Sequence, residues 1–449
     1  MSAALREALD KGPMSRFQWS AIAVCVLLNT LDGFDVLVMS FTGKTVSGEW
    51  HLSPGILGIL LSSGLAGMAL GALLVAPRAD RVGRRPVILA GLAVAALGML
   101  LSSTSQNWQQ LGALRLVTGV GIGAVLACSN VIAGEFASQR WRGLAVSLNS
   151  TGYAVGATVG GLSSVVLIDH YGWRSVFLTG GLATLAILPL VHWCLPESID
   201  FLVTRRPANA LQRVNSLARR MGHAELDALP AIPAGEDSRT GFRALLVRGL
   251  RGPTLVMWGA FFLVMAAFYF VTSWTPTLLV EAGMSSSQGL TGGTLLNLGG
   301  IFGTALLGVL AARYALLSVL RSYLFAAGVL IVAFAASTSL LTLAFCLGAV
   351  IGVAVSGCVA GLYALTPGVY STKLRATGVG AAIGVGRVGA ILAPTVAGWL
   401  LDAGWAPRSL YVATGAVFVA AGLLLFAMRA GRPTPEGAST AKPALSSGS

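Results

Sequence analysis

Long apolar runs alternate with short polar segments along almost the whole chain. Twelve of these runs are long enough for a helix to cross about 30 Å of hydrocarbon at 1.5 Å per residue. The pattern predicts an all-α membrane protein with twelve transmembrane helices. The first six are expected at 20–43, 56–77, 87–105, 109–136, 143–168 and 175–195, and the second six at 254–280, 287–311, 315–337, 340–367, 376–401 and 408–428.

The longest polar stretch divides these helices into two sets of six. Residues 1–195 are expected to form one six-helix bundle and residues 254–430 the other, with 196–253 as a cytoplasmic linker between them. The linker contains breaker residues and one surface helix, expected at Ala208–Met221. The tail, 431–449, is rich in Pro, Gly, Ser and Thr, a composition typical of disorder.

The two sets also resemble each other in sequence. Arg142-Gly-Leu-Ala-Val opens the fifth helix of the first set, and Arg375-Ala-Thr-Gly-Val opens the fifth helix of the second. Each precedes a Gly-rich helix suited to close packing. Two pseudo-symmetric bundles of this kind place a substrate site near the middle of the membrane, between the halves.

Composition and charge support a membrane protein. Of the 449 residues, 55% are hydrophobic and 10% charged, against roughly 25% charged in soluble domains. With both termini inside, Lys44, Arg174 and Arg408 face outward and Arg115 and Arg387 lie within the membrane. The other 25 of the 30 basic residues then face the cytoplasm. This one-sided distribution explains the net charge of +13 without nucleic-acid binding, which it excludes.

Cysteine and histidine give no sign of metal chemistry. The five cysteines lie singly within apolar runs, and the four histidines show no ligand spacing. We therefore expect no metal and no cofactor.

Two carboxylates within the first apolar run require an explanation. Asp32 and Asp35 are three residues apart, so they share one face of a helix. Gly33 between them thins the helix, which lets another backbone or a ligand approach. Buried carboxylates are costly, so either they only join helices or they form a proton or substrate site. We favour proton coupling by this pair.

Two arginines lie at matching depths in other helices. Asp32 and Arg387 are each about 17–18 Å from the cytoplasmic ends of their helices, counted at 1.5 Å per residue. Asp35 and Arg115 lie about 12 and 9 Å below the outer surface. An arginine fork suits a substrate carboxylate, and desolvation favours a protonated Asp. Arg387 as a purely structural ion-pair partner is the alternative.

Other polar and aromatic residues within the spans are candidates for the lining of the same site. Each alone is equally suited to helix packing, but as a set they fit an aromatic ring that carries a carboxylate. With Arg115 and Arg387, the candidate substrate-binding residues are Asn130, Asn149, Tyr153, Tyr269, Trp274, Asn297 and Tyr363.

A charged loop follows the second span, with the sequence Ala76-Pro-Arg-Ala-Asp80-Arg-Val-Gly83-Arg-Arg85. The chain turns at Gly83, and Asp80 is placed to cap a helix or to pair with an arginine. Either this is a solvated, charge-balanced surface, or it is a latch between helices that opens during transport. The candidate cytoplasmic gate residues are Asp80, Arg81, Gly83, Arg84, Arg85, Glu135, Arg142 and Arg375.

This loop resembles the signature of the major facilitator superfamily, Gly-x-x-x-Asp-Arg-x-Gly-Arg-Arg, with Ala76 in place of the leading Gly. Over nearly the whole chain the sequence further resembles the aromatic acid:proton symporter family, which carries benzoate-like acids inward with protons. The resemblance rests on Asp32-Gly-Phe-Asp35, Arg115-Leu-Val-Thr-Gly, Leu195-Pro-Glu-Ser and the stretch from Arg375 to Pro394. Cys128-Ser-Asn130 departs from it, because members often have Pro before this Asn.

The resemblance implies a monomeric secondary transporter in the bacterial inner membrane, importing a small organic anion with protons. A proton-driven antiporter that exports drugs or acids is the first alternative. A membrane enzyme is the second, because Asp-x-x-Asp also occurs in enzymes that bind magnesium diphosphates. Such enzymes need a second Asp-rich motif, and the remaining Asp residues form no such cluster.

Overall fold

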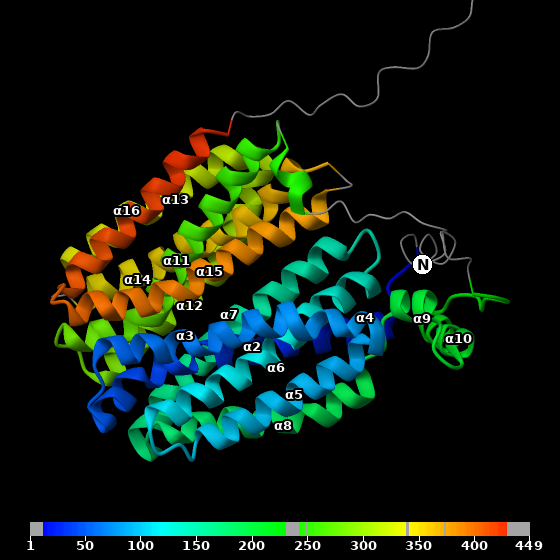
Figure 1. Cartoon of the computed structure of the whole chain (residues 1–449), viewed down its shortest axis with the longest axis horizontal. Coiled ribbons are helices and arrows are strands. Elements are labelled where there is room, and N and C mark those ends of the chain that lie inside the picture. The colour runs from blue at the N-terminus through cyan, green and yellow to red at the C-terminus, as the bar shows by residue number, and fades with distance from the viewer. Residues whose placement is uncertain (1–11, 230–241, 248, 338–340, 372–373, 429–449) are drawn as a thin grey trace, which may run out of the picture.

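The structure, a computed structural model, describes residues 12–229, 242–247, 249–337, 341–371 and 374–428. Within them, twelve helices are long and apolar enough to cross a membrane. No β-strand occurs in this part of the chain. Figure 1 shows two bundles lying side by side, the first coloured blue to green and the second green to red. The fold is the one that the apolar runs predict. The predicted disordered tail, 431–449, lies outside the described residues.

The first bundle is built from six long helices, which begin and end close to the predicted boundaries. They are α2 (Arg16–Trp50), α3 (Pro54–Leu70), α5 (Arg84–Ser102), α6 (Trp108–Phe136), α7 (Arg142–Tyr171) and α8 (Arg174–Cys194). Two ends differ most: α3 ends seven residues before 77, and α2 extends seven residues beyond the predicted end at 43. The apolar run marks only the part inside hydrocarbon, and the helix continues past it through polar residues.

The second bundle repeats the packing of the first. Its helices are α11 (Arg251–Glu281), α12 (Ser286–Arg313), α13 (Leu316–Ser337), α14 (Leu341–Leu365), α15 (Arg375–Asp402) and α16 (Pro407–Phe426). In the first bundle α2 packs on α7, α3 on α6, and α5 on α8. The corresponding pairs in the second are α11 with α15, α12 with α14, and α13 with α16. The predicted pseudo-symmetry is therefore present in the contacts.

The second span does not continue to residue 77 as one α-helix. After α3 come a π-helical turn, η1 (Gly71–Val75), a 3-10 turn, η2 (Ala76–Arg78), and the short α4 (Ala79–Val82). A Cβ at Gly71 would lie 2.1 Å from the carbonyl oxygen of Val120, so α6 approaches the backbone closely here. Pro77 lacks an N–H and cannot complete a regular ladder. Both residues explain the break.

Two short helices follow the first bundle, α9 (Ile199–Arg205) and α10 (Ala210–Met221). The sequence predicts only the second of them, because seven residues are too few to show a periodic pattern. Helix α10 begins two residues after the predicted start, since Asn209 has a left-handed backbone with φ 59°. Helix α9 lies beside α4 at one end of the first bundle, and α10 packs against α9 (Figure 1).

The two ends of the bundles are named here for residues that lie there. The Trp50 end carries the turn between α2 and α3, and the Asp80 end carries α4, α9 and the start of α5. The bundles meet along three helix pairs: α3 with α15, α7 with α12, and α2 with α11. The helices that carry Asp32, Tyr153 and Arg387 (α2, α7 and α15) are all among these six.

Candidate functional site

Glycines bring α2 and α7 into backbone contact beside the acidic pair. A Cβ at Gly33 would lie 1.9 Å from the carbonyl oxygen of Tyr153, and a Cβ at Gly156 would lie 1.8 Å from that of Thr30. Real Cβ atoms do not approach so closely, so only glycine allows this packing. As expected from its place between the two carboxylates, Gly33 thins the helix, and the backbone that approaches is that of Tyr153.

Asp35 and Arg115 form a buried ion pair inside the first bundle. Arg115 Nη1 donates to Asp35 Oδ1 over 2.7 Å, and Nη2 donates to Oδ2 over 3.0 Å and to the Asp35 carbonyl over 2.8 Å. Arg115 is 1% exposed and Asp35 2%. Gly64 of α3 lies against the guanidinium, where a Cβ would be 3.3 Å from Nη2. Arg115 is thus engaged by its own bundle.

Asp32 faces a second group of residues, which includes side chains of the other bundle. It is 4% exposed, and its Oδ1 has no hydrogen-bond partner among the described residues. Asp32, Tyr153, Tyr269 and Arg387 lie within electrostatic reach of one another. Arg387 Nη1 is 3.5 Å from Tyr269 Oη, and Asp32 and Arg387 form no direct ion pair. We call these four residues the central cluster.

Several other predicted lining residues have partners within their own bundle. Asn29 Nδ2 donates to Asn149 Oδ1 over 2.8 Å, and Asn149 donates in turn to Asn130, which joins α2, α7 and α6. Asn29, in the first apolar run, is absent from the sequence-based candidates. Asn297 donates to the carbonyl of Gly293 one helical turn earlier. Asn29, Asn130 and Asn149 thus join three helices of the first bundle, whereas Asn297 bonds within its own helix.

Two aromatic candidates differ in their surroundings. Trp274 is fully buried, and its indole N–H donates to the carbonyl of Pro394 over 3.0 Å. It fastens α11 to α15. Tyr363 is 36% exposed, packs edge-on against Phe261, and lies within electrostatic reach of Arg387. Tyr363 therefore borders the central cluster, whereas Trp274 joins α11 to α15.

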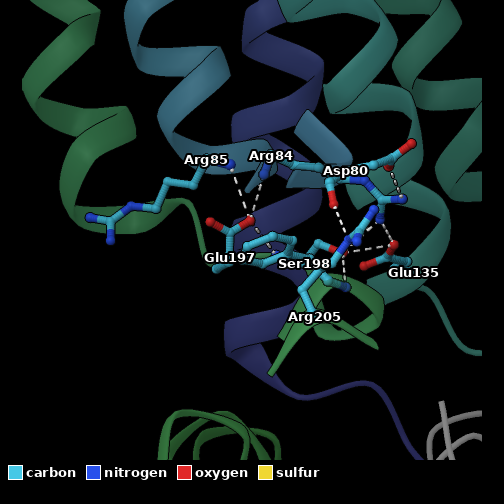
Figure 2. A network of polar contacts seen from close by, with 8 residues as sticks. Asp80, Arg84, Arg85, Glu135, Glu197, Ser198 and Arg205 are labelled. Carbon is cyan, nitrogen blue, oxygen red and sulfur yellow. Dashed lines mark hydrogen bonds and ion pairs between the residues drawn. The ribbon is translucent and has the colours of Figure 1, made fainter. Parts of the chain in front are cut away.

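The charged loop joins four elements of the first bundle (Figure 2). Arg84 pairs with Glu135 of α6 and with Ser198, and lies 3.8 Å from the Asp80 carboxylate. Glu197 Oε1 accepts from the backbone N–H groups of Arg84 and of the following residue, over 2.8 and 3.2 Å. A carboxylate thus caps the start of α5, where the helix dipole favours negative charge.

Gly83 allows this arrangement, because its φ of +105° and its distance from Glu197 both exclude a side chain. A Cβ would lie 2.4 Å from Glu197 Oε2. Glu197 and Ser198 are not among the sequence-based gate residues, although both belong to the Leu195-Pro-Glu-Ser stretch on which the family resemblance rests. Arg205 of α9 completes the network by donating to the Asp80 carbonyl.

The remaining gate candidates lie apart from this network. Arg81 is exposed, and the Arg85 side chain points away toward the carbonyl of His192 (Figure 2). Arg375 donates to the Pro367 carbonyl inside the second bundle. Arg142 begins α7, and its side chain lies outside the described part of the structure.

Polar contacts between the bundles gather at the Trp50 end. Ser40 Oγ lies 2.8 Å from the carbonyl oxygens of Thr272 and Ser273, and Lys44 pairs with Glu281. Asp402 at the end of α15 accepts from the backbone N–H of Gly55 over 2.9 Å and from Ser53 Oγ over 3.2 Å. Sequence reasoning misses these residues, because each partner lies in the other half of the chain.

The described residues contain no group of three His, Cys, Asp or Glu side chains able to hold a metal. Two bundles of membrane-spanning helices, with buried opposite charges where they face each other, are the architecture of a membrane transporter. A family model described as Major Facilitator Superfamily matches residues 22–348. The chain belongs to the Major Facilitator Superfamily.

Curated relatives narrow the resemblance. The chain is 34% identical to the gallate transporter of Pseudomonas putida over 94% of both chains. It is 32% identical to the 4-hydroxybenzoate transporter of Pseudomonas aeruginosa, over 88% of this chain and 89% of the relative. It is 29% identical to the benzoate transport protein of Acinetobacter baylyi, over 89% and 86%. The predicted resemblance to aromatic acid transporters is confirmed, and the membrane-enzyme alternative is excluded by the family.

Solved structures confirm the fold. The xylose transporter of E. coli, in a partially occluded inward-open conformation, superposes with a TM-score of 0.72 at 16% identity. The match covers 92% of this chain and 98% of the xylose transporter. The protein is thus a multi-pass membrane transporter with the major facilitator fold.

Proposed function

We propose that this transporter imports a small aromatic acid together with protons across the bacterial inner membrane. The relatives named above supply the substrate class, since their names specify gallate, 4-hydroxybenzoate and benzoate. The observation that carries the mechanism is the central cluster. There, the buried Oδ1 of Asp32, which has no hydrogen-bond partner among the described residues, lies within electrostatic reach of an arginine of the opposite bundle.

Arg387 binds the substrate carboxylate in this proposal. Its fork-shaped guanidinium suits a carboxylate, and its contact with Tyr269, at 3.5 Å, is at the limit of hydrogen bonding. Arg115 is the other candidate, but Asp35 already occupies both of its terminal nitrogens. Asp35 therefore holds Arg115, and the acid binds at Arg387.

Asp32 carries the proton. Burial disfavours the charged form of a carboxyl group, and Arg387 stabilises it. When Asp32 is protonated, it no longer attracts Arg387, whose charge is then available to the anionic substrate. The loaded carrier then moves with less uncompensated charge inside the membrane. Without substrate, the charged Asp32 and Arg387 compensate each other.

The test is transport by the Asp32→Asn variant, which imitates the protonated state permanently. We expect it to exchange labelled substrate across vesicles but to lose accumulation driven by an imposed pH gradient. Asp35→Asn is the matched variant, and it should weaken transport while leaving a dependence on the gradient. Continued accumulation by Asp32→Asn would show that another group couples the proton. Substrate accumulation that occurs only in inside-out vesicles would favour the export antiporter.

A further inference from the structure

Two polar atoms of the central cluster are buried and have no hydrogen-bond partner among the described residues. They are Asp32 Oδ1 and the hydroxyl oxygen of Tyr153. Buried polar groups in proteins are nearly always paired, because an unpaired one loses its hydration without compensation. Both atoms belong to the first bundle, and the Gly33 contact holds their helices together.

The cation of the cluster comes from the other bundle. Arg387 lies on α15, and Tyr153 lies on α7, which is the corresponding helix in the first bundle. Tyr153 comes 11 residues after Arg142, and Arg387 comes 12 residues after Arg375. The two halves therefore present a hydroxyl and a guanidinium from nearly equivalent positions. A ligand between them meets a cation on one side and uncharged or acidic oxygen atoms on the other.

We propose that Tyr153 and Asp32 bind a ring hydroxyl of the substrate, so that the transporter selects hydroxylated aromatic acids over unsubstituted ones. This inference rests on the proposed function, in which Arg387 holds the carboxylate. The ring hydroxyl donates to Asp32 Oδ1 and accepts from the Tyr153 hydroxyl. Because carboxylate and hydroxyl bind to opposite bundles, the hydroxyl must lie away from the carboxylate on the ring, at position 3 or 4.

The energetic reason is an asymmetry between the two kinds of ligand. A hydroxylated acid gives both buried oxygens a partner, whereas benzoate covers them with apolar ring edge and leaves them unpaired. Sites built to hydrogen-bond a substrate hydroxyl reject the analogue that lacks it much more strongly than apolar pockets reject an added group. We expect a preference of about tenfold or more.

Four acids measure this preference in the purified full-length transporter: benzoate and its 2-, 3- and 4-hydroxy derivatives. Each is tested for binding and for competition with a labelled acid in vesicles. The 3- or the 4-hydroxy acid should bind about tenfold or more tightly than benzoate. The 2-hydroxy acid should gain little, because its hydroxyl lies beside the carboxylate.

Tyr153→Phe removes the proposed donor, and the ratio of hydroxylated acid to benzoate affinity should fall toward one. Tyr323→Phe is the matched control. Its hydroxyl is also buried with no partner in the described part of the chain, but Tyr323 lies on α13, and its ring packs against Gly357. This variant should keep the wild-type ratio. Thermal unfolding of both variants shows whether each is folded, and the ratio itself is insensitive to the amount of active protein.

The outcomes separate this inference from the proposed function. Transport of benzoate and the hydroxylated acids with equal affinity would overturn the hydroxyl site and leave aromatic acid transport intact. A Tyr153→Phe variant that keeps the full ratio would do the same. Failure to transport any of the four acids would overturn both proposals.

Discussion

At the scale of single residues, the site depends on a missing side chain as much as on the charged ones. Gly33 lets the Tyr153 backbone contact α2, and this contact fixes where the Tyr153 hydroxyl lies relative to Asp32. Charged residues alone would not give this arrangement, because any residue larger than glycine at position 33 would separate α2 from α7.

Gly33→Ala should therefore destabilise the protein and impair transport. The added Cβ would lie 1.9 Å from a backbone oxygen, so α2 and α7 must shift. Overpacking of this kind costs about 1–3 kcal/mol. Thermal unfolding in detergent and uptake in vesicles measure both effects. Gly134→Ala on α6 is the control, since nothing lies within 4 Å of its Cβ position. Equal melting temperatures for both variants would contradict the close contact.

Arg387→Lys tests the geometry of carboxylate binding. Lysine keeps the charge but loses the planar fork, so affinity for the acid should fall about tenfold or more, about 1.4 kcal/mol. Substrate binding to the purified protein is the measurement. Arg408→Lys, an exposed arginine at the start of α16, should bind like wild type. Unchanged affinity in Arg387→Lys would place the carboxylate elsewhere.

At the scale of elements, each end of the molecule has a carboxylate that caps the start of a helix. At the Asp80 end, Glu197 caps α5 from within the same bundle. At the Trp50 end, Asp402 caps α3 from the opposite bundle. Only the second contact must break when the bundles separate at that end, so Asp402 stabilises the closed arrangement seen here.

Removing the Asp402 carboxylate should open the Trp50 end. Hydrogen bonds to a charged group contribute about 1.5–3 kcal/mol, so Asp402→Ala should raise the open population about tenfold or more. Thr277→Cys, placed in a background without native cysteines, reports opening. This position is 1% exposed and faces Gly43 across the bundles. Labelling by a membrane-impermeant thiol reagent should become faster.

Asp169→Ala is the control for that experiment. Asp169 is an exposed acid near the end of α7 that lies at the Trp50 end of the molecule. Its labelling rate should match that of the parent. If Asp402→Ala labels no faster than Asp169→Ala, the cap contributes nothing to closure.

The elements also show what sequence can predict. The twelve spans follow from the apolar runs, because a helix in hydrocarbon must be apolar over its whole crossing. The Asp35–Arg115 pair follows from the depth of the two residues in the membrane. The helical rise of about 1.5 Å per residue places both charges at similar distances below the outer surface. The Asp402 cap does not, because Gly55 lies 347 residues away and offers only a backbone N–H. The break at Gly71 depends likewise on a contact with α6.

The central cluster is intermediate in this respect. The sequence identifies Asp32, Arg387 and Tyr153 as candidates, but it equally suggests Asn149 and Asn297, which bond to neighbours in their own bundle. Polar residues in a span look alike in sequence whether they face a ligand or another helix. Only side-chain partners separate the two cases.

At the scale of the whole molecule, the distribution of basic residues predicts the orientation in the membrane. We propose that both termini and the linker at 196–253 are cytoplasmic, with the Asp80 end inside. Reporter fusions after Arg220 and at the C-terminus should both give a cytoplasmic signal. A fusion in the turn after Trp50 should give the opposite signal. An external reading at either of the first two positions would reverse the map.

The Asp35–Arg115 pair also bears on how the chain enters the membrane. Arg115 is synthesised 80 residues after Asp35, a delay of about 4–16 s at roughly 5–20 residues per second. During this time α2 carries uncompensated carboxylates, each costing about 2.5–3.5 kcal/mol at the centre of an isolated span. Arrival of α6 removes this cost for Asp35, so the pair favours release of α2 into lipid together with α6 rather than before it. We therefore expect the first four spans to leave the translocation machinery together more readily than α2 alone.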